Sequence, residues 1–516
     1  MDETLTVPSD ANGDGPSQDA PSFEEVNVVV SDMHLSAGKV LQVRVKRSLS
    51  HRVRRWMKGL FAGVDSPAVV EVPNPLEDFV YDDIFAAFVA RVVATYGRAD
   101  TLRIRLMGDV FDPLAVTWNG SLSDPPFEAA AAFKMRKIIR GHAAFFDALA
   151  GFIRLPNAKL DVFVGNHDQF LCWPKVQHEV VRRLAGGDSA AAAKIRFVDQ
   201  SMGFEDFDRG VLYDHGMNAE AHNTIDPRTA ILTDHFGKPL KRPVLNKPLG
   251  SHMTVTLANR LKLKNPLIGR MPTEWDIWLH AAKHQWAWGV FAGFALLWML
   301  VYNQLFAFWD IRRKTGLLTV LRVVIATTKH NPVDTYAEKA FRRREGARVV
   351  VLGHSHIPRR VTGPDGTYIN TGTWAMKLRF VHPTFACRWT RFRWLEVVWL
   401  TIRHFLKTGE LAFTRQLTKL LGFVAAVAAG VVFLLTSFPR NGFHVLSYDL
   451  LDLKLPVGIL LVFLVVAGLF RIFAIKPDLA DDTQFTFGLV RHGKDGGLQA
   501  DLMRYMPHED AIRDYV

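Results

Sequence analysis

Little cysteine, no leader-like start and no repeat mark this sequence, and each absence excludes a class of protein. The 516 residues include two cysteines, Cys172 and Cys387, which are too few for a disulfide framework and are typical of a reducing compartment. Residues 1–25 have neither a basic start nor an apolar stretch, so they do not form a secretory signal; their polar, acidic composition predicts a disordered tail. No fixed-period repeat is found, which excludes a solenoid or a propeller.

The composition is that of a large, basic, well-packed protein. Hydrophobic residues make up 49% of the chain, and the formal net charge is +12. At about 150 residues per domain, the length predicts two or three domains. A basic balance suits either nucleic acid or an anionic membrane surface, and composition alone does not choose between them.

Five short polar segments stand out, most of them directly after an apolar run that predicts a buried strand. They are Asp32-Met33-His34, Gly108–Asp112, Gly165–Asp168, His215-Gly216 and Gly353–His356. Helical stretches alternate with these strands, so we expect an α/β layered core. Such folds place their sites where strands end, which predicts that the five segments meet at one place.

The side chains of these segments predict a particular chemistry. Imidazole, carboxylate and amide ligands together suit borderline divalent ions, with Mn, Fe and Zn the leading candidates. A carboxylate that bridges two such ions holds them about 3.5–4 Å apart, close enough to share a hydroxide that attacks phosphorus. We therefore expect two divalent metal ions as cofactors.

The same segments resemble the motifs of the calcineurin-like metallophosphoesterase family, over residues 26–223 and 335–380. The resemblance implies an α/β fold, namely a four-layer α/β/β/α sandwich with a dinuclear site at the sheet edge. One ion would bind Asp32, His34 and His356, the other Asn166, His215 and His354, and Asp109 would bridge both. His167 matches the family's catalytic histidine, which protonates the leaving oxygen or stabilises the transition state.

Several neighbouring residues have two interpretations. Asp168 and Asp112 are candidate catalytic residues that orient His167 or a ligand, but either aspartate could instead cap a following helix. Asn223 lies in a region that shapes the substrate pocket in related proteins. Met217 stands where many relatives carry a second histidine or an aspartate, and this departure bears on substrate preference.

Three apolar runs have the length of membrane spans: residues 286–309, 420–438 and 456–475. A single crossing at 286–309 would separate His354 from the other ligands, so we expect this run to lie in the interface or dip into one leaflet. A buried helix in a soluble protein is the alternative. The later pair predicts a hairpin anchor, with an αα-hairpin docked on the core as the alternative. Basic flanks put the catalytic domain on the cytoplasmic face.

The predicted organisation therefore has five parts. A tail (1–25) is followed by the first part of the core (26–223), an insertion (224–334), the second part of the core (335–410), and a membrane hairpin with a cytoplasmic tail (411–516). After the first motif, residues 45–60 have apolar side chains every three or four positions and basic side chains on the other faces, which predicts a helix lying on anionic lipid. A solvated basic helix packed on the core is the alternative, and a nucleic-acid face is less favoured beside three apolar segments.

The sequence thus predicts a membrane-attached phosphoesterase with two metal ions. We expect hydrolysis of a phosphodiester, pyrophosphate or phosphomonoester bond in a phosphorylated, lipid-like substrate. The phrases GDVFD and GNHDQF resemble, more loosely, the branch with UDP-2,3-diacylglucosamine pyrophosphatase, although members of that branch carry Arg where His167 stands. The alternatives are a phosphoesterase for a soluble nucleotide or phosphoprotein, and a non-catalytic membrane scaffold. A homo-oligomer is compatible with the sequence.

Overall fold

The computed structural model describes residues 23–44, 69–235, 237–263, 270, 332–380 and 479–515. These residues form a mixed α/β fold with parallel and antiparallel sheets, as the alternation of strands and helices predicts. The chain divides into two compact units. The first is Met1–His252 with Asn331–Ala375 and Gln484–Val516, and the second is Met253–His330 with Met376–Thr483.

A seven-stranded sheet forms the larger part of the first unit. Its order is β18-β17-β16-β1-β4-β5-β6. The strands β1, β4, β5 and β6 run parallel, and β16, β17 and β18 add antiparallel strands beyond β1. The bounds are β1 (Phe23–Val30), β4 (Thr101–Met107), β5 (Ala158–Phe163), β6 (Ile195–Val198), β16 (Phe485–Gly493), β17 (Leu498–Met506) and β18 (Ala511–Asp514).

A five-stranded sheet of order β12-β13-β11-β8-β7 forms the rest of the core. Its central strands β13, β11 and β8 are parallel, and the edge strands are antiparallel. The bounds are β7 (Glu205–Asp208), β8 (Val211–Asp214), β11 (Val349–Leu352), β12 (Arg359–Gly363) and β13 (Gly366–Asn370).

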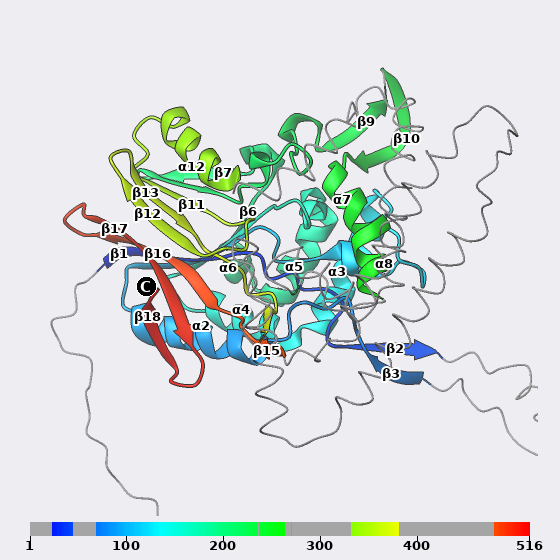
Figure 1. Cartoon of the computed structure of the whole chain (residues 1–516), viewed down its shortest axis with the longest axis horizontal. Coiled ribbons are helices and arrows are strands. Elements are labelled where there is room, and N and C mark those ends of the chain that lie inside the picture. Colours follow the sequence, from blue (N-terminus) through cyan, green and yellow to red (C-terminus); the bar gives the residue numbers. More distant parts are fainter. Residues whose placement is uncertain are drawn as a thin grey trace, which may run out of the picture. The chain divides into compact units, whose positions relative to one another are not determined.

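The two sheets pack face to face through one apolar cluster, in which Val29 and Phe163 of the first sheet meet Val351 and Ile369 of the second. The helix α12 (Pro332–Arg343) covers the other face of the five-stranded sheet. Helices α2 (Asp82–Tyr96) and α4 (Ala143–Ile153) lie on the outer face of the seven-stranded sheet, where the Phe88 ring contacts β16 and β17. The layers therefore run helix, sheet, sheet, helix (Figure 1).

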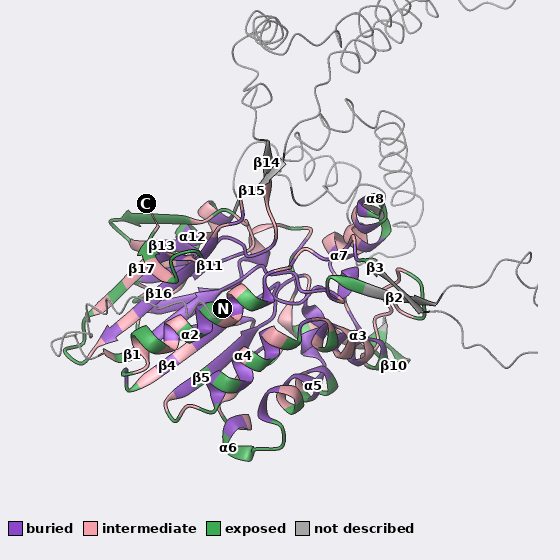
Figure 2. Cartoon of the chain, turned by 90° about the horizontal axis from the view of Figure 1, so that it is seen from below, coloured by how far each residue is buried: buried purple, intermediate pink, exposed green. Residues whose placement is uncertain are grey.

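Burial follows from this layering. Strands between a helix layer and a second sheet are covered on both faces, so most of their residues are buried. Strand β5 is almost entirely buried, whereas helices α2, α4 and α5 carry both exposed and buried residues (Figure 2). The remaining described helices are α3 (Glu128–Gly141), α5 (Pro174–Ala185), α6 (Ser189–Ala192), α7 (Leu249–Met253) and α8 (Asn259–Lys262).

The predicted cytoplasmic tail at the end of residues 411–516 is wrong. Residues 485–514 form β16, β17 and β18 of the core sheet, and β16 pairs with β1 so that Val28 lies opposite Leu489. The core is thus built from three stretches of chain instead of two. The first of these strands is buried on both faces, which gave it a short apolar pattern that is hard to distinguish from the end of a membrane segment.

The predicted insertion is also not separate throughout. Residues 224–252 belong to the first unit, where they include the hairpin of β9 (Ile231–His235) and β10 (Lys238–Leu245). The predicted boundary at residue 224 is therefore too early. Strand β1 likewise begins at Phe23, inside the stretch predicted to be a tail.

In the second unit, β14 (Leu378–Phe380) pairs with β15 (Leu479–Asp481), and the N–H of Leu378 donates to the carbonyl of Arg270 at 2.7 Å. In the first unit, β2 (Val40–Arg44) and β3 (Val69–Pro73) form a separate antiparallel pair. Within the part of the chain that the structure describes, no helix has the length and apolar character needed to span a membrane. The three apolar runs and residues 45–60 lie outside the described residues.

Candidate metal centre

The predicted ligands lie just beyond the carboxyl ends of parallel strands from both sheets. Asp32 follows β1, Asp109 follows β4, and Asn166 follows β5 in the seven-stranded sheet. His215 follows β8 and His354 follows β11 in the five-stranded sheet. The pairing of the sheets therefore brings together segments that are distant in the sequence, at the edge where α/β folds place their sites.

Two clusters of ligand atoms result. One cluster holds Asp32, His34 and His356, and within it all ligand atoms lie within 4.8 Å of one another. His356 Nε2 is 3.1 Å from His34 Nε2 and 3.3 Å from Asp32 Oδ1. This spacing of imidazole and carboxylate donors suits a divalent ion.

The second cluster holds Asp109, His215 and His354, again with ligand atoms within 4.8 Å of one another. His215 Nε2 lies 3.3 Å from Asp109 Oδ2. The other ring nitrogen, Nδ1, bonds the carbonyl of Met107 at 3.0 Å, which makes Nδ1 the donor and leaves the Nε2 lone pair facing the cluster. A third group, His34 with Asp112 and His167, adjoins the first.

Asn166 provides a test of whether these residues fit metal ions. Its side-chain oxygen Oδ1 is buried and has no hydrogen-bond partner. Buried polar atoms are almost always paired, so an oxygen left in this state needs an explanation such as a cation. Together with the donor types of the two clusters, it indicates that the His and Asp groups could hold metal ions.

The backbone at the ligands is strained. Non-glycine residues rarely adopt positive φ, yet φ is 52° at Asp32, 56° at His34, 51° at Asp109, 67° at His354 and 58° at His356. Residues in this region cost free energy and cluster at functional sites. The strain is held by bonds between motifs, since the N–H of Asp32 donates to Gly108 O at 3.1 Å and that of His34 donates to Asp109 O at 3.0 Å.

Two of the motif positions require glycine for a steric reason. A Cβ atom on Gly165 would lie 2.3 Å from Asp109 Oδ1, and one on Gly353 would lie 2.6 Å from Asp32 Oδ2. Any side chain at either position would displace a carboxylate of another motif. The glycines therefore let the motif loops approach closely enough to share one site.

His167 lies at the edge of the first cluster, with its ring 4.6 Å from that of His34. Its Nδ1 is 3.3 Å from Asp112 Oδ1. The same Asp112 oxygen accepts the N–H groups of Leu114 at 3.0 Å and Ala115 at 3.3 Å, so it also caps the 3-10 helix Pro113–Ala115. The two interpretations of Asp112, cap and orienting partner, both describe its contacts.

Asp168 makes different contacts from those expected. Its carboxylate accepts the N–H of Gly165 at 2.6 Å on one oxygen, and the N–H groups of Val110 at 3.0 Å and Phe111 at 3.3 Å on the other. It makes no side-chain cap of the following 3-10 helix. Asp168 thus joins the Asp109 loop to the Asn166 loop, and the carboxylate that faces His167 is that of Asp112.

Burial and neighbouring charges together set the protonation of the histidines in the centre. Burial and repulsion from His167 and His356 lower the pKa of His34 to about 3. Against the effect of burial, the Asp109 carboxylate raises the pKa of His215 to about 10, and Asp112 with Asp109 raises that of His167 to about 9. The buried carboxylates therefore attract positive charge, which in this protein is either a proton on histidine or a cation.

Asn223, the predicted substrate-binding residue, lies beside the second cluster. Its Nδ2 is 3.4 Å from His354 Nε2 and 2.7 Å from Glu220 Oε2. Glu220 was not among the residues predicted from the sequence, because no motif surrounds it. Met217, the point of departure from relatives, is fully buried.

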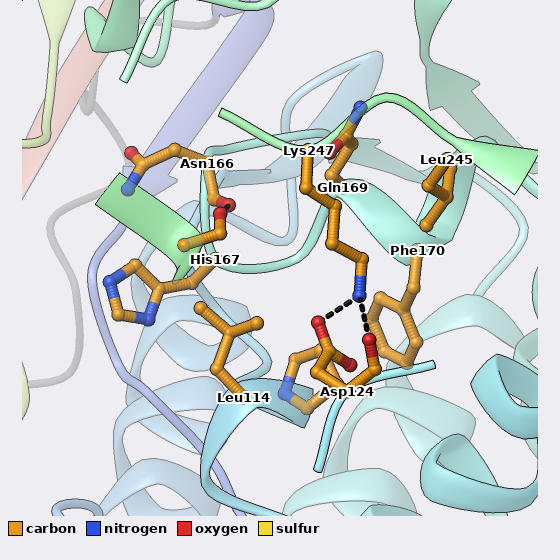
Figure 3. Close-up of a pocket in the computed structure, with 10 residues that line it drawn as sticks. Leu114, Asp124, Asn166, His167, Gln169, Phe170, Leu245 and Lys247 are labelled. Carbon is orange, nitrogen blue, oxygen red and sulfur yellow. Dashed lines mark hydrogen bonds and ion pairs between the residues drawn. The ribbon is translucent and has the colours of Figure 1, made fainter. Parts of the chain in front are cut away.

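A small pocket lies beside His167 and Asn166 (Figure 3). Lys247 enters it from the segment predicted as an insertion, and its ammonium group pairs with Asp124. Lys134 Nζ binds the same carboxylate at 2.8 Å. Nearby, Ser251 Oγ donates to the carbonyl of Asn166 at 3.1 Å. Residues 245–251 therefore form part of the wall of the site.

Comparison of the chain with models of protein families and with curated proteins found no match.

Proposed function

We propose that this protein is a membrane-attached phosphoesterase that uses two divalent metal ions. It would hydrolyse a phosphodiester, pyrophosphate or phosphomonoester bond in a lipid-linked or amphiphilic substrate. The observation that carries the proposal is the meeting of five motif segments, from two sheets, in three neighbouring groups of ligand atoms. The helix–sheet–sheet–helix layering is also what the four-layer sandwich of the calcineurin-like metallophosphoesterases would require.

In this proposal, Asp32, His34 and His356 hold one ion, and Asn166, His215 and His354 hold the other. Asp109 would serve both ions, and its Oδ2 lies 3.3 Å from His215 Nε2 in the second cluster. Mn, Fe and Zn are the ions that such mixed ligands suit best. When bound, the pair of ions supplies an activated hydroxide and stabilises charge on the phosphoryl oxygens.

The remaining step belongs to His167 and Asp112. Asp112 Oδ1 faces His167 Nδ1, so it holds a proton on that nitrogen and directs Nε2 away from itself. An imidazolium in this position can donate its Nε2 proton to the oxygen that leaves phosphorus. Asp168, which accepts the N–H of Gly165 and ties this loop to the Asp109 loop, keeps the donor in place.

Chain topology supports an attachment that leaves the centre on one side of a membrane. Residues 381–478, which hold two of the apolar runs, depart after β14 and return at its partner β15. Residues 271–331, which hold the other run, lie between two described parts of the chain. Each stretch must therefore cross a bilayer an even number of times or not at all, in accord with a hairpin anchor and an interfacial helix on the cytoplasmic face.

Metal analysis combined with a substrate panel tests the proposal. The purified full-length chain should contain two divalent ions and hydrolyse aryl phosphates, phosphodiesters or lipid-linked pyrophosphates, and Asp109→Ala should lose both the ions and the activity. Asp226→Asn is the matched control, because Asp226 is an exposed carboxylate that bonds Arg228. Turnover of soluble nucleotides alone would favour the alternative of a phosphoesterase for a soluble nucleotide or phosphoprotein. Absence of metal-dependent turnover on every substrate would favour a scaffold.

A further inference from the structure

Glu220 lies beside the second cluster, next to His354. Its Oε2 lies 3.2 Å from His354 Nε2, 2.7 Å from Asn223 Nδ2 and 3.3 Å from His222 Nε2. It comes directly after the 3-10 helix Met217–Ala219, which follows the ligand His215. The same short segment therefore supplies one ligand and a partner for another.

These contacts determine which nitrogen of His354 can face an ion. A carboxylate accepts hydrogen bonds and cannot donate one, so the His354 nitrogen beside Glu220 must carry the proton. That nitrogen is Nε2, which leaves the Nδ1 lone pair available to a cation. His215 has the opposite arrangement, with Nδ1 bound to the carbonyl of Met107 and Nε2 facing Asp109.

We propose that Glu220 is a positioning residue for the second metal ion, acting through His354. The inference rests on the proposed function. Glu220 fixes the tautomer and the ring orientation of His354 through the contact between its Oε2 and Nε2. Carboxylate–histidine–metal arrangements act in this way, and removal of the outer partner typically lowers metal affinity by about 10–100-fold.

The surroundings of Glu220 support a fixed orientation. Histidine and asparagine nitrogens surround its carboxylate: His354 Nε2, His222 Nε2 and Asn223 Nδ2 all lie within 3.3 Å of Oε2. Asn223 fixes it from the side, and Asn223 is itself tightly enclosed, because a Cβ atom on Gly250 would lie 1.9 Å from Asn223 Oδ1. The sequence-based role of Asn223 in the substrate pocket can thus include holding Glu220.

Equilibrium dialysis with Mn²⁺, together with Mn²⁺ EPR, tests the role of Glu220 on the full-length chain after removal of bound metal. Glu220→Ala removes both the acceptor and the charge, and Glu220→Gln keeps an acceptor oxygen without the charge. We expect Glu220→Ala to weaken the second Mn²⁺ site by about 10–100-fold and to leave the first site unchanged. Glu220→Gln should weaken it less, and EPR should show a loss of the coupled pair at limiting Mn²⁺.

His222→Ala is the matched control, since His222 Nε2 lies 3.3 Å from the same Glu220 oxygen and His222 is not one of the proposed metal ligands. It should bind two Mn²⁺ ions with nearly the affinity of the wild type. Unchanged second-site affinity in Glu220→Gln and in any folded Glu220→Ala would overturn the inference while the proposed function stands. A wild-type chain that binds fewer than two ions would overturn both.

Discussion

Replacing Asp168 by asparagine tests how the two central motif loops are held together. The aspartate uses both oxygens, one for Gly165 and the other for Val110 and Phe111. Asparagine has one acceptor oxygen, so in either orientation its NH₂ group must face at least one backbone N–H. Because Asp168 is fully buried, water does not replace the lost partner.

The size of the effect follows from the bonds that are lost. A hydrogen bond to a charged group contributes about 1.5–3 kcal/mol, and an unsatisfied buried donor costs about 1–3 kcal/mol. Burial and the Asp109 carboxylate raise the pKa of Asp168 to about 7, so the fold disfavours its charge and the cost of the change is that of the unsatisfied N–H. At pH 8 we expect Asp168→Asn to lower the free energy of unfolding by about 1–3 kcal/mol, and to weaken ion binding because the Asp109 and Asn166 loops separate.

Chemical denaturation and equilibrium dialysis with Mn²⁺ measure the two effects. Asp188→Asn is the matched control. Asp188 also accepts two backbone N–H groups, those of Ala190 at 2.9 Å and Ala191 at 3.2 Å, but it uses one oxygen for both. Asparagine caps helices as well as aspartate does, so this variant should change little. Equal stability and equal ion affinity for the two variants would refute the reasoning.

Further predictions concern catalysis, pH and the membrane. His167→Ala should keep two bound ions but lower kcat by about 100-fold or more; retained turnover would remove its assigned role. Against burial, two neighbouring carboxylates raise the pKa of His142 to about 9, above 6.5 in the unfolded chain. The protonated His142 should stabilise the fold by up to about 3 kcal/mol. This effect should be complete below pH 6.5 and disappear as the pH rises through 9. The difference in Tm between the wild type and His142→Gln should therefore shrink over this range, and a constant difference would contradict the prediction. Replacing residues 381–478 by Asn-Gly should join Phe380 to Leu479, which are already paired, in a tight hairpin. The folded protein should then leave the membrane fraction if this stretch is the main anchor, as flotation on vesicles would show.

Much of the site was predictable because most of its residues belong to short local sequence motifs. The segments around Asp32, Asp109 and His354 follow strands, and strand ends meet at one sheet edge. Their glycines also carry a signal, since close approach of two loops leaves no room for a Cβ atom. These features are local in sequence, so they could be found without knowledge of the fold.

The remaining parts depended on contacts between distant residues. Glu220 has no motif, and only the fold brings it to His354. That Asp112 faces His167 while Asp168 joins two loops depends on side-chain directions that spacing does not determine. Arg105 is a third example: it is fully buried and pairs with Asp161 at 2.8 Å and Asp206 at 2.6 Å, although a sequence offers no reason to place an arginine inside a strand of the core. Paired buried charges of this kind appear only once the partners are placed.

The pairing of β1 with β16 has a consequence for the order of assembly. Val28 lies opposite Leu489, so one side of the strand that precedes Asp32 stays open until the ribosome has made nearly the whole chain. At about 5–20 residues per second, translation leaves that edge exposed for roughly half a minute or longer. During this interval the apolar runs emerge first, and whatever captures them does so before the last strands close the sheet.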